Sequence, residues 1–181
     1  MGLPGSSRNV QNLVDTHYVP LYRYAYRLTG RSNDAEDLTQ ETFCKAQLNL
    51  TQLRDTARAK AWLFSILRNA YLHRLRAARQ HPCVSLDTAG EVAEPLGDPM
   101  PEIDPEQLQS ALGELPEAFR TPIILFYFED FSYRAIAEQM DLPLGTVMSR
   151  LARGKAYLRS RLVQPVPTAL SDAPRRATDG L

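Results

Sequence analysis

Cysteine is scarce in this chain of 181 residues, which contains only Cys44 and Cys83. Two cysteines are too few for the disulfide framework of a small secreted domain, so we expect a protein of the reducing cytoplasm. No apolar run reaches the roughly 18–20 residues that span a bilayer, and the longest, TPIILFYF at 121–128, suits a buried core. The start MGLPGSSRNVQ has no apolar stretch after a basic segment, so we expect no secretory signal.

Motifs for catalysis and metal binding are missing as well. The sequence has no glycine-rich loop that could cradle phosphates, and His17, His73 and His81 lack the spacing of a zinc protease. A metal or redox site could be imagined from His81 and Cys83 together with Cys44 and His73. Because these residues lie in unrelated segments, we favour the alternative that they are ordinary residues without such a site. We therefore expect neither an enzyme nor a bound cofactor or metal.

Acidic residues are absent from two stretches in which basic residues gather, 57–80 and 144–162. The chain has 21 Lys+Arg and 21 Asp+Glu, but residues 1–80 hold 12 basic and 6 acidic residues, whereas residues 81–106 hold seven acidic residues and no basic one. Two solvated basic faces would have glutamate interspersed among the basic residues. The segregation instead favours a polyanion that is bound at two places, and a nucleic acid is the expected partner.

Composition divides the chain into two helical blocks and a linker. Residues 82–105 hold five of the thirteen prolines together with most of the acids of the middle region, which disfavours a packed element. We accordingly expect a disordered N-terminus, a first domain, an extended acidic linker, a second domain and a flexible tail, at 1–8, 9–80, 81–104, 105–162 and 163–181.

The first block has helical periodicity and no alternating strand pattern. Apolar residues recur at spacings of three and four between Val14 and Leu28, and Gly30 should end this helix because glycine accepts the left-handed conformation. Asn33 is expected to cap a second helix. A third helix should run over about 58–80 with Trp62 in the core, which completes a three-helix bundle.

The second block has the pattern of a helix-turn-helix. Asp104 should cap a first helix that begins with proline, and Pro122 should kink the next helix or delay its start. Ser132 should cap a short helix, a turn follows at 141–143, and the last helix begins near Leu144. The chain is thus predicted to be all-α, with two small helical domains joined by the extended acidic linker.

The last helix has a polar and basic face opposite its apolar stripe. The residues of this face are Thr146, Ser149, Arg150, Arg153 and Lys155. Arginine can donate to guanine edges in the major groove, whereas lysine, serine and threonine often bind phosphates. An ordinary helical hairpin with a charged face is the alternative, and we favour DNA binding.

Three stretches resemble, in order, the extracytoplasmic-function group of bacterial RNA polymerase sigma factors. They are DAEDLTQETFCKA (34–46), AWLFSILRNAYLHRLR (61–76) and the stretch 115–162 that begins LPEAFRTPIILFYFEDF. The resemblance implies that the first block is sigma domain 2, which binds polymerase and the −10 element. It implies that the second block is sigma domain 4, whose helix-turn-helix reads the −35 element.

The resemblance also implies individual roles. Asp37, Gln40 and Glu41 would form one polar patch, one helical turn long, that docks on the coiled coil of the beta-prime subunit. The −10 element would be read and opened, with phosphates held, by Arg68, Asn69, His73, Arg74 and Arg76. The loop 49–56 would receive a flipped base. Contacts to the −35 element would come from Thr146, Ser149, Arg150, Arg153 and Lys155.

Four positions depart from the usual residues of this family. His73 stands where aspartate is common, Met148 where lysine or arginine is common, and Ala152 where an aromatic residue or histidine is frequent. Asp130 replaces a common glycine. These departures bear on the promoter sequence and leave the expected fold unchanged.

The resemblance implies three partners, which are core RNA polymerase, promoter DNA and an anti-sigma factor. The polymerase would be contacted at the beta-prime coiled coil and the beta flap. The chain itself would not insert into a membrane; it would be cytoplasmic, or held at the inner membrane face by the anti-sigma factor. The linker would follow the RNA-exit channel of the polymerase. The alternative is a two-domain helix-turn-helix repressor or activator, which would not need the acidic patch followed by a basic helix with Asn69.

Overall fold

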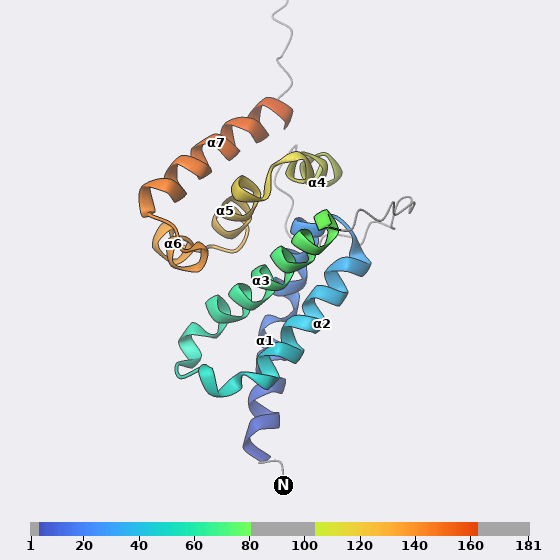
Figure 1. Cartoon of the computed structure of the whole chain (residues 1–181), viewed down its shortest axis with the longest axis vertical. Helices are drawn as coiled ribbons and strands as arrows, with labels where there is room; N and C mark the ends of the chain where they lie inside the picture. Colours follow the sequence, from blue (N-terminus) through green and yellow to red (C-terminus); the bar gives the residue numbers. More distant parts are fainter. Residues whose placement is uncertain (1–3, 81–103, 163–181) are drawn as a thin grey trace, which may run out of the picture.

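The computed structural model describes residues 4–80 and 104–162, which form helices and connecting turns without a strand (Figure 1). The α-helices of this part are α1 (Pro4–Thr29), α2 (Ser32–Leu48), α3 (Ala59–Gln80), α4 (Pro105–Glu114), α5 (Glu117–Tyr127), α6 (Tyr133–Met140) and α7 (Leu144–Leu162). Two short 3-10 helices, η1 (Leu50–Gln52) and η2 (Thr56–Arg58), join α2 to α3. The all-α prediction is confirmed. None of the described helices combines the length and the apolar character that crossing a membrane requires.

Helices α1, α2 and α3 form the N-terminal bundle, as the sequence predicted. α2 packs against both α1 and α3, and the core of the bundle contains Leu21, Tyr24, Leu38 and Phe64, all fully buried. The expected core residue Trp62 is half-buried and packs at the edge of this core. α1 begins at Pro4, so the described helix includes residues that were expected to form a disordered N-terminus.

The sequence predicted the end of α1 correctly but not the start of α2. Gly30 adopts a φ of +73° and its amide donates to the carbonyl of Tyr26 at 2.7 Å, which ends α1 as expected. The prediction that Asn33 caps α2 is wrong. The capping position is Arg31, whose carbonyl already accepts the amide of Ala35 at 3.0 Å, so Asn33 lies inside the first turn.

Helices α4 to α7 form the C-terminal bundle, in which α7 packs against α4, α5 and α6. The carboxylate of Asp104 accepts the amide of Glu106 at 3.1 Å, and this confirms the predicted cap of α4. Pro122 does not delay the start of its helix. α5 begins at Glu117, five residues earlier, and encloses Pro122 in the buried side of the helix.

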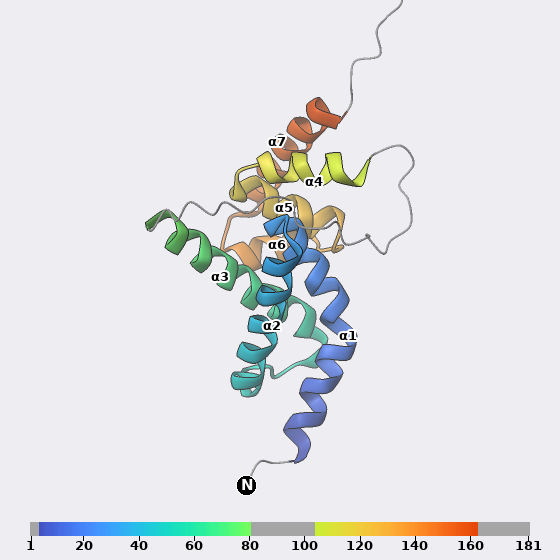
Figure 2. The ribbon, with the colours of Figure 1, turned by 90° about the vertical axis from the view of Figure 1, so that its right-hand side faces the viewer.

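The two bundles pack against each other at the end of α1, away from the N-terminus (Figures 1 and 2). The guanidinium of Arg120 on α5 donates to the carbonyl of Leu28 at 2.7 Å and to the hydroxyl of Tyr71 at 3.2 Å. The side-chain amide of Gln109 on α4 reaches the carbonyl of Arg27 at 3.3 Å. These bonds satisfy carbonyls at the C-terminal end of α1, which a helix cannot pair internally.

Candidate nucleic-acid and protein interfaces

Helices α6 and α7 form the predicted helix-turn-helix. The hydroxyl of Ser132 accepts the amide of Ala135 at 3.2 Å and caps α6. Asp141 ends α6 in the left-handed conformation, with a φ of 52°, and the amide of Leu142 donates to the carbonyl of Ala137 at 3.0 Å. The chain therefore reverses within a few residues, and α7 crosses α6 closely.

A glycine lets α7 approach α5. Gly154 is buried, and a Cβ at this position would lie 2.8 Å from Cγ1 of Ile123. Val147 and Leu151 are buried on the same side of α7. The close packing of α7 on α5 fixes which side of α7 faces the core, and the opposite side is exposed to solvent.

The solvent side of α7 carries most of the residues predicted to contact the −35 element. Ser149, Arg153 and Lys155 are exposed, whereas Thr146 and Arg150 are half-buried at its flank. The structure thus places the five residues on one helix but only three of them on its open face. Near the end of α7, Arg161 and the hydroxyl of Tyr157 bind the carboxylate of Glu114 on α4, an arrangement that sequence patterns did not indicate.

Helix α3 presents three of the predicted −10 residues on one exposed face. Asn69, His73 and Arg76 are exposed and follow one another at spacings of four and three, so they share one side of the helix. From Asn69 to Arg76 this face is about 10 Å long, at 1.5 Å per residue, and its side chains could contact a strand of nucleic acid along that length.

Arg68 does not join this face. Its side chain is only 14% exposed and its Nε lies 3.8 Å from Oε1 of Glu117 on α5. Arg68 therefore points at the C-terminal bundle. Glu117 also accepts a hydrogen bond from the hydroxyl of Thr121 at 3.0 Å.

Arg74 binds a residue of the predicted polymerase patch. Its Nη2 lies 2.7 Å from Oε2 of Glu41 on α2, and Lys45 binds the other carboxylate oxygen at 2.6 Å. The hydrogen bond from Lys45 is the main cause that lowers the pKa of Glu41, and the one from Arg74 acts in the same direction against the opposing effect of burial. Asp37 and Gln40 are exposed beside this ion pair.

The contact between the bundles contains a carboxyl group that sequence reasoning missed. Glu129 is only 5% exposed, and its burial raises the pKa of this carboxyl to about 7 although Lys60 and Arg27 oppose the shift. The ammonium of Lys60 donates to the backbone carbonyl of Glu129 at 2.6 Å. The following residue, Asp130, has a φ of 57°, a conformation that glycine adopts more easily.

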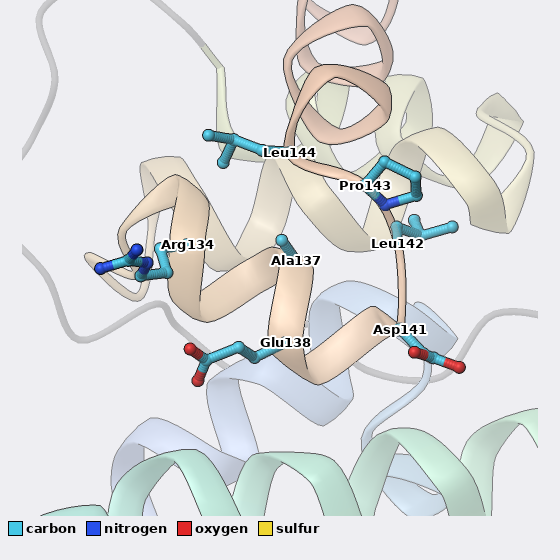
Figure 3. A pocket seen from close by; sticks show the side chains of 7 residues that line it. All are labelled: Arg134, Ala137, Glu138, Asp141, Leu142, Pro143 and Leu144. Atoms are coloured by element: carbon cyan, nitrogen blue, oxygen red, sulfur yellow. The ribbon is translucent and has the colours of Figure 1, made fainter.

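A shallow pocket lies beside the turn of the helix-turn-helix (Figure 3). Arg134, Glu138 and Leu144 point to one side of the turn and Asp141 points to the other. The pocket is open to solvent and has no cluster of metal-binding side chains; within residues 4–80 and 104–162 there is no group of three such residues.

Other predicted features fall at the loop 49–56 or outside the described residues. In the loop, the side-chain amide of Asn49 donates to the carbonyl of Lys45 at 2.8 Å, and the carboxylate of Asp55 accepts the amide of Ala57 at 2.9 Å. Cys44 is exposed. The remaining members of the metal or redox alternative, His81 and Cys83, the linker up to residue 103 and the tail lie outside the described residues.

Comparison with protein families accounts for both bundles. The profile described as Sigma-70 region 2 matches residues 13–81, and the profile described as Sigma-70, region 4 matches residues 105–158. Together the two ranges cover more than half of the chain.

Curated relatives carry one common description, ECF RNA polymerase sigma factor. SigL of Mycobacterium tuberculosis is 37% identical over 153 residues, which cover 83% of this chain and 86% of SigL. SigW of Bacillus subtilis is 28% identical over 163 residues, covering 83% of this chain and 87% of SigW. SigE of Mycolicibacterium smegmatis is 36% identical over 158 residues, covering 84% of this chain but 61% of SigE, so the chain spans less than two thirds of that relative.

Solved structures share the fold. A chain of the co-crystal structure of the sigma factor RpoE with the anti-sigma factor NepR from Bartonella quintana matches with a TM-score of 0.70 at 26% identity, over 88% of this chain and 98% of that chain. The structure of CnrH with the cytosolic domain of CnrY matches with a TM-score of 0.59 at 24% identity, over 85% of this chain and 87% of that chain.

Proposed function

This chain belongs to the extracytoplasmic-function RNA polymerase sigma factors of the sigma-70 family, and we propose that it binds core RNA polymerase and directs it to specific promoters. The observation that carries this function is the match of both family regions, in order, to the two bundles. We further propose that the chain performs no catalytic step itself. Its task is then recognition, and the polymerase supplies the chemistry.

The C-terminal bundle would read the −35 element through α7. Exposed Ser149, Arg153 and Lys155 support this role because their helix has no acidic residue and its opposite side is held by the core. Thr146 and Arg150, at the flank, would contact phosphates on one edge of the groove.

The N-terminal bundle would bind the −10 element through α3. Asn69, His73 and Arg76 support this role by sharing one exposed face. Arg68 and Arg74 would add phosphate contacts after leaving their present carboxylate partners. The loop 49–56 would receive an unstacked base.

The polymerase would be contacted by both bundles. Asp37 and Gln40, with Glu41 behind them, form the proposed contact with the beta-prime coiled coil, and the C-terminal bundle would contact the beta flap. The proposed domains are 9–80 and 105–162, and the acidic linker between them would follow the RNA-exit channel.

An anti-sigma factor is the proposed regulator. The RpoE–NepR complex supports this partner, because its matched chain has the same fold over 88% of this chain. We propose a cytoplasmic factor that such a partner can hold at the inner membrane face.

Transcription with purified core polymerase tests the proposal. The full chain should co-elute with core enzyme and produce run-off transcripts from a subset of genomic fragments, which core enzyme alone does not produce. Asp37→Lys should reduce co-elution, whereas Glu36→Lys, an exposed neighbouring acid outside the proposed patch, should retain it. A chain that binds DNA but never core enzyme would instead be the repressor or activator.

The contribution of Arg153 to promoter selection is a separate expectation. Arg153→Ala should weaken binding of the holoenzyme to its promoter by about 1–3 kcal/mol if the guanidinium contacts a base edge. Arg161→Ala is the matched control, because Glu114 already holds this guanidinium away from DNA. Equal promoter binding by wild type and Arg153→Ala would contradict the assigned reading face.

A further inference from the structure

The open side of α7 carries two parallel strips of different chemistry. Leu144, Met148 and Ala152 follow one another at intervals of four residues and form an apolar strip. Ser149 and Arg153 form a polar strip directly beside it. The first half of the helix therefore exposes apolar and hydrogen-bonding groups side by side.

The side chains of the apolar strip are largely accessible to solvent. Leu144 is 49% exposed and Met148 is 52% exposed, although both residues belong to a helix whose buried side is well packed. Ala152 is exposed as well. Among the described residues, the C-terminal bundle therefore leaves this strip uncovered and free to contact a partner.

The charge around the strip favours nucleic acid over an apolar protein surface. Arg153 and Lys155 lie beside it, Arg150 lies further round the helix beyond the polar strip, and α7 contains no acidic residue. An apolar protein groove would leave these cations without partners, whereas DNA places phosphates on both sides of its grooves. Among the four bases, thymine alone presents a methyl group in the major groove.

We propose that Met148, flanked by Leu144 and Ala152, reads thymine methyl groups in the −35 element. This inference rests on the proposed promoter binding by α7. The thioether of methionine is unbranched and polarizable, so it can follow the contour of a methyl group. From Leu144 to Ala152 the strip is about 12 Å long, at 1.5 Å per residue. That length matches about three base-pair steps of 3.4 Å.

The same geometry assigns different tasks to the two strips. Ser149 and Arg153 are suited to hydrogen-bond acceptors, such as guanine O6 and N7. Met148 and its neighbours have no donor to offer and discriminate through the methyl group alone. The preferred −35 element should therefore combine guanine and thymine at neighbouring positions.

Holoenzyme assembled from the full chain and core polymerase provides the test. Preferred sequences are first selected from duplexes that are randomised upstream of a constant −10 region. Each selected thymine is then replaced by deoxyuridine, which removes the methyl group and keeps the base pair. Wild type should bind about fourfold more weakly at one or two neighbouring positions, the effect expected for one methyl-sized group.

Variants of α7 identify the side chain responsible. Met148→Ala should bind the thymine duplex about as weakly as wild type binds the deoxyuridine duplex, and it should show no further weakening with deoxyuridine. Ser149→Ala should bind more weakly and keep its sensitivity to deoxyuridine. Ser160→Ala, an exposed position about three turns further along α7, should match wild type in both respects. Because Met148, Ser149 and Ser160 are all exposed, the three variants should have melting temperatures close to that of wild type.

Three outcomes would overturn the inference. They are a selected −35 element without thymine on either strand, a wild type that ignores every thymine-to-deoxyuridine change, and a Met148→Ala variant that remains sensitive to it. Failure of the chain to bind core polymerase or to select any upstream sequence would overturn the proposed function and this inference with it. Selection without a methyl effect would overturn this inference alone.

Discussion

At the scale of single residues, two helical glycines have opposite surroundings. A Cβ on Gly154 would meet Cγ1 and Cδ1 of buried Ile123 at 2.8 and 3.2 Å, whereas a Cβ on Gly113 of α4 would have nothing within 4 Å. The first glycine is needed for the approach of α7 to α5. The second has no packing role.

Alanine at these two positions should therefore change stability in opposite directions. Gly154→Ala should lower the free energy of unfolding by up to about 2 kcal/mol, because overpacking costs about 1–3 kcal/mol and helix propensity returns only about 1 kcal/mol. Gly113→Ala should raise the free energy of unfolding by about 0.5–1 kcal/mol. Thermal unfolding followed by circular dichroism measures both, and a stabilised Gly154→Ala variant would contradict the described contact.

The helices that sequence periodicity predicted are present in the structure. Each of them has an apolar stripe that packs into the core. The caps at Asp104 and Ser132 were predictable from the residue type and the following proline or apolar run. Asn33 misled the prediction because the capping position of α2 is two residues earlier, at Arg31, whose side chain makes no capping hydrogen bond. Residue type alone cannot distinguish a capping asparagine from one in the first turn.

The cap of α6 should matter because this helix has only eight residues. Ser132→Ala removes the acceptor of the Ala135 amide and should lower stability by about 1 kcal/mol. The hydroxyl of Ser160 bonds a carbonyl within its own helix, so Ser160→Ala should have a smaller effect. Urea unfolding of the two variants provides the comparison, and equal midpoints would mean that the cap contributes nothing measurable.

On the scale of the whole molecule, the contact between the bundles was beyond sequence reasoning. Arg120 and Leu28 lie 92 positions apart and Lys60 and Glu129 lie 69 apart, so no local spacing links them. Helical spacing could predict which candidate interface residues lie on α3 and on α7, and their roles stay predictions. The engagement of Arg68 by Glu117 could not, because it depends on how the bundles dock.

Docking of the bundles should weaken as the pH rises towards neutrality. Burial raises the pKa of Glu129 from 4.5 to about 7; Lys60, Arg27 and Arg23 oppose this rise and Asp130 adds to it. Because this carboxyl lies at the contact between the bundles, we take their separation to expose it to solvent, and on that premise the protonated form favours the docked state. Its stabilisation is complete below pH 4.5, falls as the pH rises to about 7 and is constant above it.

Small-angle scattering of the free chain at pH 5.5 and 7.5 measures this effect. The wild type should become more extended at the higher pH, whereas Glu129→Gln, which is neutral at both, should stay compact. Identical profiles of the wild type at the two pH values would show that ionisation of Glu129 does not control docking.

The pairing of Arg68 with Glu117 has a consequence for the unbound factor in a cell crowded with chromosomal DNA. While the guanidinium of Arg68 faces Glu117, one cation fewer is available to bind DNA phosphates. Non-specific binding of the chain to DNA is therefore expected to be weaker and less dependent on salt. Under the proposed function, less of the unbound chain is then adsorbed to the genome, and more of it is available to core polymerase.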